Sequence, residues 1–177
     1  MEGPGGRTVG KRRMPSSSEL LRIPAKRLGE PAAPDFCPLC FWRKLRLRFR
    51  LPYQFVPGVF SALDSIEKES VRQYFDEYAW LPPWMAAVGD AVRFVEPPHW
   101  SAFHTLIAER GILLTGMADG IFALRDGSYA IADYKTARFT PAQDKLLPVY
   151  AVQLNAYARI ARDRGIWPVS RLALVYF

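Results

Sequence analysis

Two stretches of the chain carry apolar residues at the spacing of an amphipathic helix. The first follows Pro57-Gly58, and its apolar positions recur about every three or four residues. These positions are Phe60, Leu63, Ile66, Val71, Tyr74, Phe75 and Tyr78. The second covers residues 148–164 and stops at Gly165, a residue typical of helix C-termini. The pattern therefore predicts two long helices.

Apolar runs separated by turn residues indicate strands in residues 112–136. The runs read ILLTG, MADGIFALRDG and SYAIADYKTA, and Asp126-Gly127, between the last two, is a common hairpin turn. We expect a three-stranded antiparallel meander here. A final β-like run, RLALVYF, follows the second helix.

Basic and apolar residues alternate towards the end of residues 36–53. The apolar positions are Leu45, Leu47 and Phe49, and the basic positions are Arg46, Arg48 and Arg50. A period of two predicts an extended segment with one basic face. Residues 81–100 contain clusters of proline and tryptophan and predict a loop that packs aromatic rings onto the core.

The length of 177 residues and a hydrophobic content of 50% fit one folded domain. Residues 1–35 are rich in Gly, Pro, Ser and basic residues, so we expect a basic, flexible N-terminal arm. A short helix at Leu20-Leu21, capped by residues 16–19, fits within it. Residues 36–177 then form the domain, and its terminal apolar strand favours a domain that is truncated at the C-terminus.

The positive charge of the chain is concentrated near the N-terminus. Residues 1–50 contain 12 Lys and Arg against 4 Asp and Glu, whereas residues 51–177 contain 12 against 13. A basic arm beside a near-neutral domain suits a polyanionic partner such as DNA, and it also suits a solubilising tail.

The sequence favours a cytoplasmic protein without a membrane partner. No apolar run reaches the roughly 18 residues of a membrane-spanning helix, and no signal-peptide core follows the basic N-terminus. The two cysteines, Cys37 and Cys40, are too close in sequence to form a disulfide framework.

Acidic and basic residues converge at the predicted hairpin. Asp133 and Lys135 share one face of a strand, and Asp119 returns beside them across the turn. Two carboxylates, a main-chain carbonyl and waters suit Mg²⁺ or Mn²⁺, and a neighbouring lysine can orient a water. Gln153 and Tyr157 lie four residues apart on the second helix and can address a phosphate or a base. This combination of carboxylates, lysine and polar helix residues is typical of sites that hydrolyse phosphodiester bonds.

Three motifs in order resemble the PD-(D/E)XK nuclease superfamily, specifically its RecB-like branch, which includes CRISPR adaptation exonucleases. They are GMAD at residues 116–119, ADYKTA at 132–137 and QLNAY at 153–157. The upstream SSSELL and CPLCFWRK are similar to the start of that branch. The resemblance covers about residues 16–177.

The resemblance implies an α/β fold with a restriction-endonuclease-like core, in which helices flank a central mixed β-sheet. It also implies a divalent-metal nuclease that acts on single- or double-stranded DNA. Asp119, Asp133 and the Tyr134 carbonyl would then bind the metal, and Lys135 would be the catalytic lysine. Gln153 and Tyr157 would lie next to the substrate.

The chain departs from the family pattern at the first helix and in its cysteines. Many relatives carry a histidine or glutamate on that helix, whereas here Asp64, or less favourably Glu67, would take its place as a further metal ligand. Some relatives hold an iron–sulfur cluster with four cysteines. Cys37 and Cys40 alone cannot build such a cluster.

Two further features have both a functional and a structural interpretation. Cys37 and Cys40 could join His99 and His104 in a zinc site, although their separation along the chain argues against a standard finger. The basic face of residues 46–50, with Arg46 and Arg48, could contact phosphates or simply be solvated.

The motifs therefore predict a Mg²⁺- or Mn²⁺-dependent deoxyribonuclease. A cleavage-inactive nucleic-acid-binding module on the same fold is the first alternative, and a structural metal protein organised on Cys37 and Cys40 is the second. The motifs do not choose between DNA and RNA, between exonuclease and endonuclease, or between repair, phage defence and CRISPR adaptation. They leave the oligomeric state open.

Overall fold

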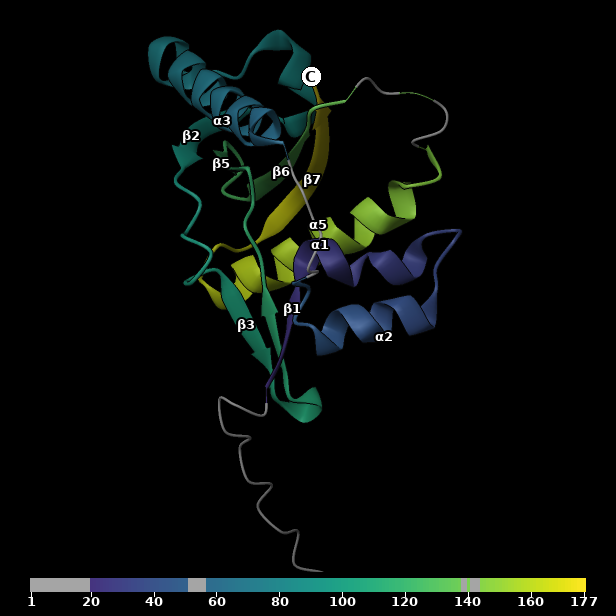
Figure 1. Cartoon of the computed structure of the whole chain (residues 1–177). Coiled ribbons are helices and arrows are strands. Elements are labelled where there is room, and N and C mark those ends of the chain that lie inside the picture. Colours follow the sequence, from purple (N-terminus) through teal and green to yellow (C-terminus); the bar gives the residue numbers. More distant parts are fainter. Residues whose placement is uncertain (1–19, 51–56, 138–139, 141–143) are drawn as a thin grey trace, which may run out of the picture.

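The computed structural model describes residues 20–50, 57–137, 140 and 144–177, which form a mixed α/β domain (Figure 1). In chain order the elements are β1 (Leu21–Pro24), α1 (Ala25–Leu28), the 3₁₀ turn η1 (Glu30–Ala32), α2 (Pro38–Arg46), α3 (Gly58–Tyr78), η2 (Pro83–Val88), β2 (Ala91–Val95), β3 (His104–Ile107), η3 (Ala108–Arg110), β4 (Ile112–Thr115), β5 (Gly120–Leu124), β6 (Tyr129–Lys135), α5 (Leu147–Asp163) and β7 (Val169–Tyr176).

The described strands form two mixed sheets, where the resemblance implied one central sheet. The smaller sheet has the order β1-β4-β3, with β1 parallel and β3 antiparallel to β4. The larger sheet has the order β2-β5-β6-β7, in which β6 and β7 are parallel and the other pairs antiparallel. The expected α/β class is therefore confirmed, with parallel and antiparallel pairs in each sheet.

The predicted meander is right for two of its strands and wrong for the third. Strands β5 and β6 form the expected hairpin, from Gly120 opposite Ala132 to Ala123 opposite Tyr129. Strand β4 instead pairs with β1 and β3 in the other sheet. Apolar alternation indicates that a segment is a strand, but it does not specify the neighbour with which that strand pairs.

Both predicted helices are confirmed as α3 and α5. Helix α5 ends at Asp163, and Gly165 adopts a positive φ of 78° just beyond it, a conformation that favours glycine. Helix α3 buries Val71 and Phe75, but other apolar residues of its pattern are exposed. These exposed residues are Phe60, Leu63, Ile66 and Tyr78.

The extended segment predicted near Arg46 is wrong, because residues 38–46 form helix α2. Pro38 occupies the first turn, where its missing N–H costs no hydrogen bond, and Cys37 caps the helix by accepting a hydrogen bond from the Cys40 N–H. Of the alternating residues 45–50, only Leu45 and Arg46 lie in the helix, and the others follow its end. Arg48 and Phe49 follow with positive φ values of 50° and 57°, which ends the helix.

Residues 81–100 contain more regular structure than the predicted loop. The 3₁₀ turn η2 buries Met85 and Val88, and strand β2 forms an edge of the larger sheet. Trp84 and Trp100 are about half exposed, so these rings do not pack fully onto the core as expected. Prolines at the start of η2 are compatible with a helical first turn, which composition alone does not distinguish from a loop.

Part of the expected N-terminal arm belongs to the fold. Strand β1 pairs with β4 from Leu21 to Pro24, so the short helix expected at Leu20-Leu21 is wrong. Ala25 of α1 is buried against α5, which lies beside α1 in Figure 1. The sheet contact and the burial of Ala25 hold these residues in place, which a local composition rule cannot foresee. Residues 1–19 lie outside the described part of the chain.

The larger sheet is buried on both faces. Phe122 packs with Val71 and Phe75 of α3 on one face, and Ile121 and Ile131 pack with α5 on the other. Because side chains alternate along β6, its odd-numbered residues face α5. None of the helices in the described ranges combines the length and apolar character needed to cross a bilayer.

Candidate functional site

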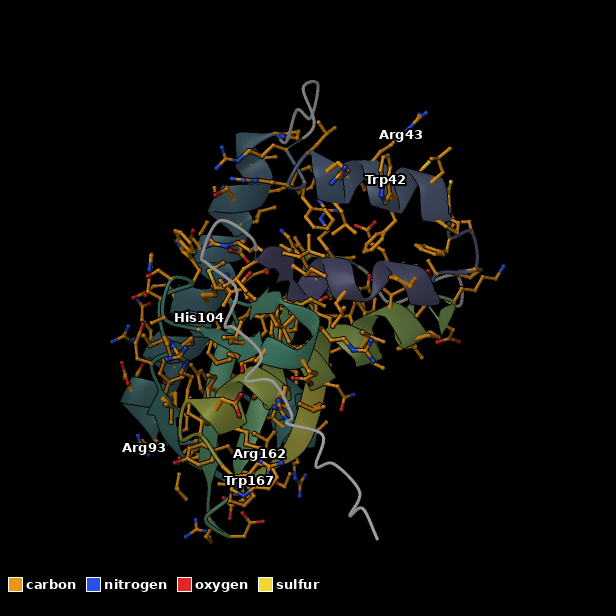
Figure 2. All side chains as sticks on the ribbon, turned by 90° about the horizontal axis from the view of Figure 1, so that it is seen from below. Trp42, Arg43, Arg93, His104, Arg162 and Trp167 are labelled. Carbon is orange, nitrogen blue, oxygen red and sulfur yellow. The ribbon has the colours of Figure 1, made fainter. Side chains whose placement is uncertain are left out.

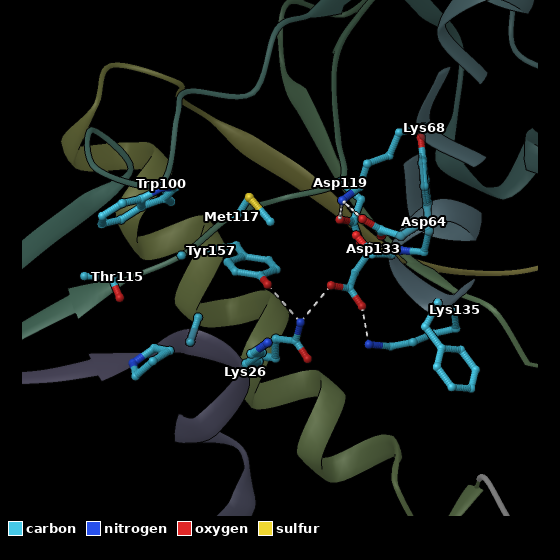
Figure 3. A pocket seen from close by; sticks show the side chains of 17 residues that line it. Lys26, Asp64, Lys68, Trp100, Thr115, Met117, Asp119, Asp133, Lys135 and Tyr157 are labelled. Atoms are coloured by element: carbon cyan, nitrogen blue, oxygen red, sulfur yellow. Dashed lines mark hydrogen bonds and ion pairs between the residues drawn. The ribbon is translucent and has the colours of Figure 1, made fainter. Parts of the chain in front are cut away.

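A cavity of about 540 Å³ lies between helices α1, α3 and α5 and the nearby ends of β4, β5 and β6 (Figure 3). Its charged lining residues are Lys26, Asp64, Lys68, Asp119, Asp133 and Lys135. Phe60, Trp100 and Met117 line its apolar part and are about half exposed. Acidic, basic and aromatic groups therefore share one pocket.

Asp133 and Lys135 occupy the C-terminal end of β6 on the face towards α5. Lys135 Nζ lies 2.5 Å from Asp133 Oδ2, which confirms that the two side chains share a face. The Asp133 side chain is only 5% exposed, whereas that of Lys135 is 22% exposed. Tyr134 points the other way, and its ring packs edge-on against Phe177. The strand period thus places the charged pair and Tyr134 on opposite faces of β6.

Asp119 immediately precedes β5 and lies beside Asp133, because Gly120 pairs with Ala132 in the hairpin. Its Oδ2 accepts a hydrogen bond from the Tyr134 backbone N–H at 2.8 Å. Its Oδ1 forms an ion pair with Lys68 Nζ at 2.8 Å. The hairpin therefore brings the two aspartates together as the sequence predicts.

Gln153 and Tyr157 line the α5 wall of the cavity and are both buried. Gln153 Nε2 donates hydrogen bonds to Asp133 Oδ1 at 2.7 Å and to the Tyr157 hydroxyl at 2.9 Å. Gly116 permits the approach of the Tyr157 ring, because a Cβ at Gly116 would lie 2.9 Å from two ring atoms. The glycine of the first motif and the glutamine and tyrosine of the third motif thus pack together next to Asp133.

Helix α3 supplies two acidic residues with different surroundings. Asp64 lines the cavity with a side chain that is 44% exposed, and its Oδ2 pairs with Lys68 Nζ at 2.7 Å. Glu67 is buried away from the cavity lining and accepts a hydrogen bond from Thr136 Oγ1 at 3.1 Å. Of the two, Asp64 is the residue that borders the cavity.

Burial and charge alter the ionisation of several groups in this cavity. Burial raises the pKa of the Asp133 carboxyl, and the charge of Asp119 adds to this rise, although Lys135 opposes it. Burial disfavours the charged form of Lys68, but Asp119 and Asp64 outweigh that effect and raise its pKa. Burial, together with the charge of Asp133, raises the pKa of the Tyr157 hydroxyl.

The donor chemistry of the aspartates fits a divalent cation that prefers oxygen ligands. Asp133 Oδ2 is buried, and among the described residues it has no hydrogen bond of regular geometry besides its ion pair with Lys135. Asp119 and Asp133 supply two carboxylates, and water or phosphate oxygens commonly complete a Mg²⁺ shell. In the described ranges, no group of three or more His, Cys, Asp or Glu side chains is placed to hold a metal ion. Asp64 therefore does not join the two aspartates in such a group.

Several residues named from the sequence lie apart from the cavity. The guanidinium carbon of Arg46 lies 5.3 Å from the centre of the Trp42 ring. Neither Arg46 nor Arg48 lines the cavity. Cys37 and Cys40 are exposed free thiols. In Figure 2 Trp42, which lies on α2 beside Cys40, is well separated from His104, so the zinc site with His99 and His104 is not assembled in the described structure.

Sequence reasoning did not assign a role to Lys68, which contacts two acidic residues of the cavity. The spacing of Asp64 and Lys68 is the i, i+4 pattern of a helical ion pair and is visible in the sequence. The contact with Asp119 is not visible there, because it depends on how α3 packs over the hairpin. Lys26 and Trp100 also line the cavity without any motif that points to them.

No protein-family model matches the chain, and a search of curated proteins found no match. The functional assignment therefore depends on the side chains of the cavity and on the resemblance of the three motifs.

Proposed function

We propose that this domain is a divalent-metal-dependent nuclease of the RecB-like PD-(D/E)XK type, with a restriction-endonuclease-like core, that hydrolyses phosphodiester bonds of DNA. The observation that supports it most is the convergence of Asp119, Asp133 and Lys135 in one cavity. Gln153 and Tyr157 of the third motif line the same cavity. Residues of three motifs that are separated in the sequence thus line the same cavity.

Asp119, Asp133 and the Tyr134 main-chain carbonyl would hold Mg²⁺ or Mn²⁺. When bound, the cation supplies positive charge that polarises the phosphate and an attacking water. The hydrogen bond from the Tyr134 N–H orients Asp119, and the hydrogen bond from Gln153 orients Asp133. Both carboxylates are therefore held in position before any ligand arrives.

Lys135 is the proposed catalytic lysine. Its ammonium group lies against Asp133 and 4.4 Å from the centre of the Tyr150 ring, so it is held close to the cavity. From this position it can donate a hydrogen bond to an attacking water and offset negative charge that develops on the phosphate. Gln153 and Tyr157 would contact the substrate beside it. Arg46 and Arg48 would meet only DNA that extends beyond the cavity.

The proposal is tested by incubating labelled single- and double-stranded DNA with the purified protein and Mg²⁺, Mn²⁺ or EDTA. Asp133→Asn and Lys135→Met are the site variants. Asp90→Asn and Arg125→Met are matched controls, because they disrupt an exposed ion pair that does not line the cavity. We expect metal-dependent products that the site variants lose and the controls retain. A folded wild-type protein that cuts nothing in either metal would overturn the proposal.

A cleavage-inactive nucleic-acid-binding module on the same fold is the second candidate. One observation favours it: Lys68 and Lys135 already neutralise the two aspartates without a metal. This candidate predicts DNA binding in EDTA, seen as a change in fluorescence anisotropy, with no products in Mg²⁺ or Mn²⁺. Metal-dependent products would exclude it.

A further inference from the structure

Lys68 lies between two carboxylates that come from different parts of the fold. Its Nζ is 2.7 Å from Asp64 Oδ2 on its own helix and 2.8 Å from Asp119 Oδ1 at the start of β5. The side chain is 27% exposed, so the ammonium group is partly withdrawn from water. A cationic group thus bridges α3 and the hairpin at the edge of the cavity (Figure 3).

Asp119 presents its two oxygens in different directions. Oδ1 forms an ion pair with Lys68, whereas Oδ2 accepts a hydrogen bond from the backbone N–H of Tyr134. Tyr134 is the residue after Asp133 in β6. A carboxylate oxygen has two acceptor sites, so Oδ2 can still take part in binding an ion on the side of Asp133. On the side of Asp64, the position suited to a cation is already taken by Lys68.

We propose that Lys68 acts as a built-in cation between Asp64 and Asp119, so that the site binds a single divalent ion, on the side of Asp133. This inference rests on the proposed function and assigns Asp64 to Lys68 instead of to the metal. An ammonium group a few ångströms from a dication repels it, and this repulsion is strong in a partly buried site. Lys68 is thus a positioning residue that sets how many metal ions the site accepts.

The neutral variant Lys68→Met tests the role of Lys68 directly, because methionine has an unbranched side chain of similar length and carries no charge. Asp64 and Asp119 would then face each other without a cation and form a second oxygen site. Isothermal titration with Mn²⁺, and electron paramagnetic resonance of the unbound Mn²⁺, count the bound ions without any measurement of cleavage. We expect one ion per wild-type chain and two per Lys68→Met chain.

The double variant Lys68→Met/Asp64→Asn separates this role from a merely structural one. It removes one carboxylate of the new site, so the count should return to one ion. Lys44→Met is the matched control, since Lys44 forms a comparable 2.8 Å ion pair with Glu30 away from the cavity. That control should bind one ion. Lys68→Gln provides a second neutral variant if Lys68→Met does not fold.

The outcomes separate this inference from the proposed function. A wild-type protein that binds two ions, or neutral Lys68 variants that still bind one, would overturn the role of Lys68 and leave the nuclease proposal standing. Loss of the single wild-type ion in Asp133→Asn supports the proposed location of that ion. A folded wild-type protein that binds no Mn²⁺ would overturn both.

Discussion

Gln153 holds Asp133 in position through a hydrogen bond of 2.7 Å from Gln153 Nε2 to Asp133 Oδ1. The bond joins helix α5 to strand β6 inside the protein, where both side chains are nearly fully buried. The same nitrogen also donates to the Tyr157 hydroxyl at 2.9 Å. Both polar hydrogens of the amide are thus used within the fold. Gln153 therefore orients the carboxylate as well as bordering the cavity.

Replacing Gln153 with leucine should destabilise the protein. The change leaves a buried carboxylate oxygen and a buried hydroxyl without this donor, which typically costs about 1–3 kcal/mol. The free energy of unfolding in urea measures the loss. Asn155→Leu is the control on the same helix, because the Asn155 side chain is exposed and bonds only to Ala151 O of its own helix, as far as the described residues show. Equal effects of the two substitutions would contradict the role given to Gln153.

Lys135→Met should lower stability more at neutral pH than in mild acid. Burial raises the folded-state pKa of Asp133, so its charged form opposes folding above that pKa and the opposition disappears as protonation proceeds. Lys135 limits this effect, and its removal leaves a nearly buried charge unpaired, at a cost of about 3 kcal/mol. Urea unfolding at pH 7 and at about pH 4, close to the ordinary pKa of 3.8, should show a deficit that shrinks in acid. A deficit that is independent of pH would argue against the pairing.

Gly116→Ala should destabilise the fold and disturb the cavity. The added Cβ would lie 2.9 Å from the Tyr157 ring and 3.0 Å from Ile160 Cδ1, and such overpacking typically costs about 1–3 kcal/mol. Gly58→Ala is the control, because no atom in the described part of the chain lies within 4 Å of its added Cβ and alanine favours a helix. Thermal unfolding should show a lower midpoint for Gly116→Ala and an equal or higher midpoint for Gly58→Ala.

The ion pairs of Glu30 should contribute stability at neutral pH and lose it in acid. Burial alone would raise its pKa, but Lys44 and Arg27, each 2.8 Å away, outweigh burial and lower it. The contribution is therefore complete above the ordinary pKa of 4.5 and disappears as the pH falls through the lower folded-state value.

Glu30→Gln tests this pH dependence. The variant should be less stable than wild type by about 1 kcal/mol at pH 7, a typical value for partly exposed pairs. The difference in unfolding free energy should approach zero near pH 3. A constant difference from pH 7 to pH 3 would show that the loss arises from packing and not from charge.

Local patterns in the sequence were sufficient to predict several elements of this domain. Helices α3 and α5 and the β5–β6 hairpin are confirmed because helical spacing, strand alternation and the Asp126-Gly127 turn each involve neighbouring residues. The shared face of Asp133 and Lys135 follows from the same strand period. Their place in one cavity with Asp119 follows from the hairpin.

Contacts between distant segments were decided by the tertiary structure. The pairing of β4 with β1 and β3, and the position of Lys68 against Asp119, depend on the path of the chain between elements. Apolar periodicity is satisfied equally by any partner that buries the same face, so it cannot select one. The sequence alone therefore determined α3, α5, the β5–β6 hairpin and the motif residues, but not β1, β2, β3 or α2. Packing of α3 over the larger sheet determined which charges meet, because only the folded chain brings Lys68 within bonding distance of Asp119.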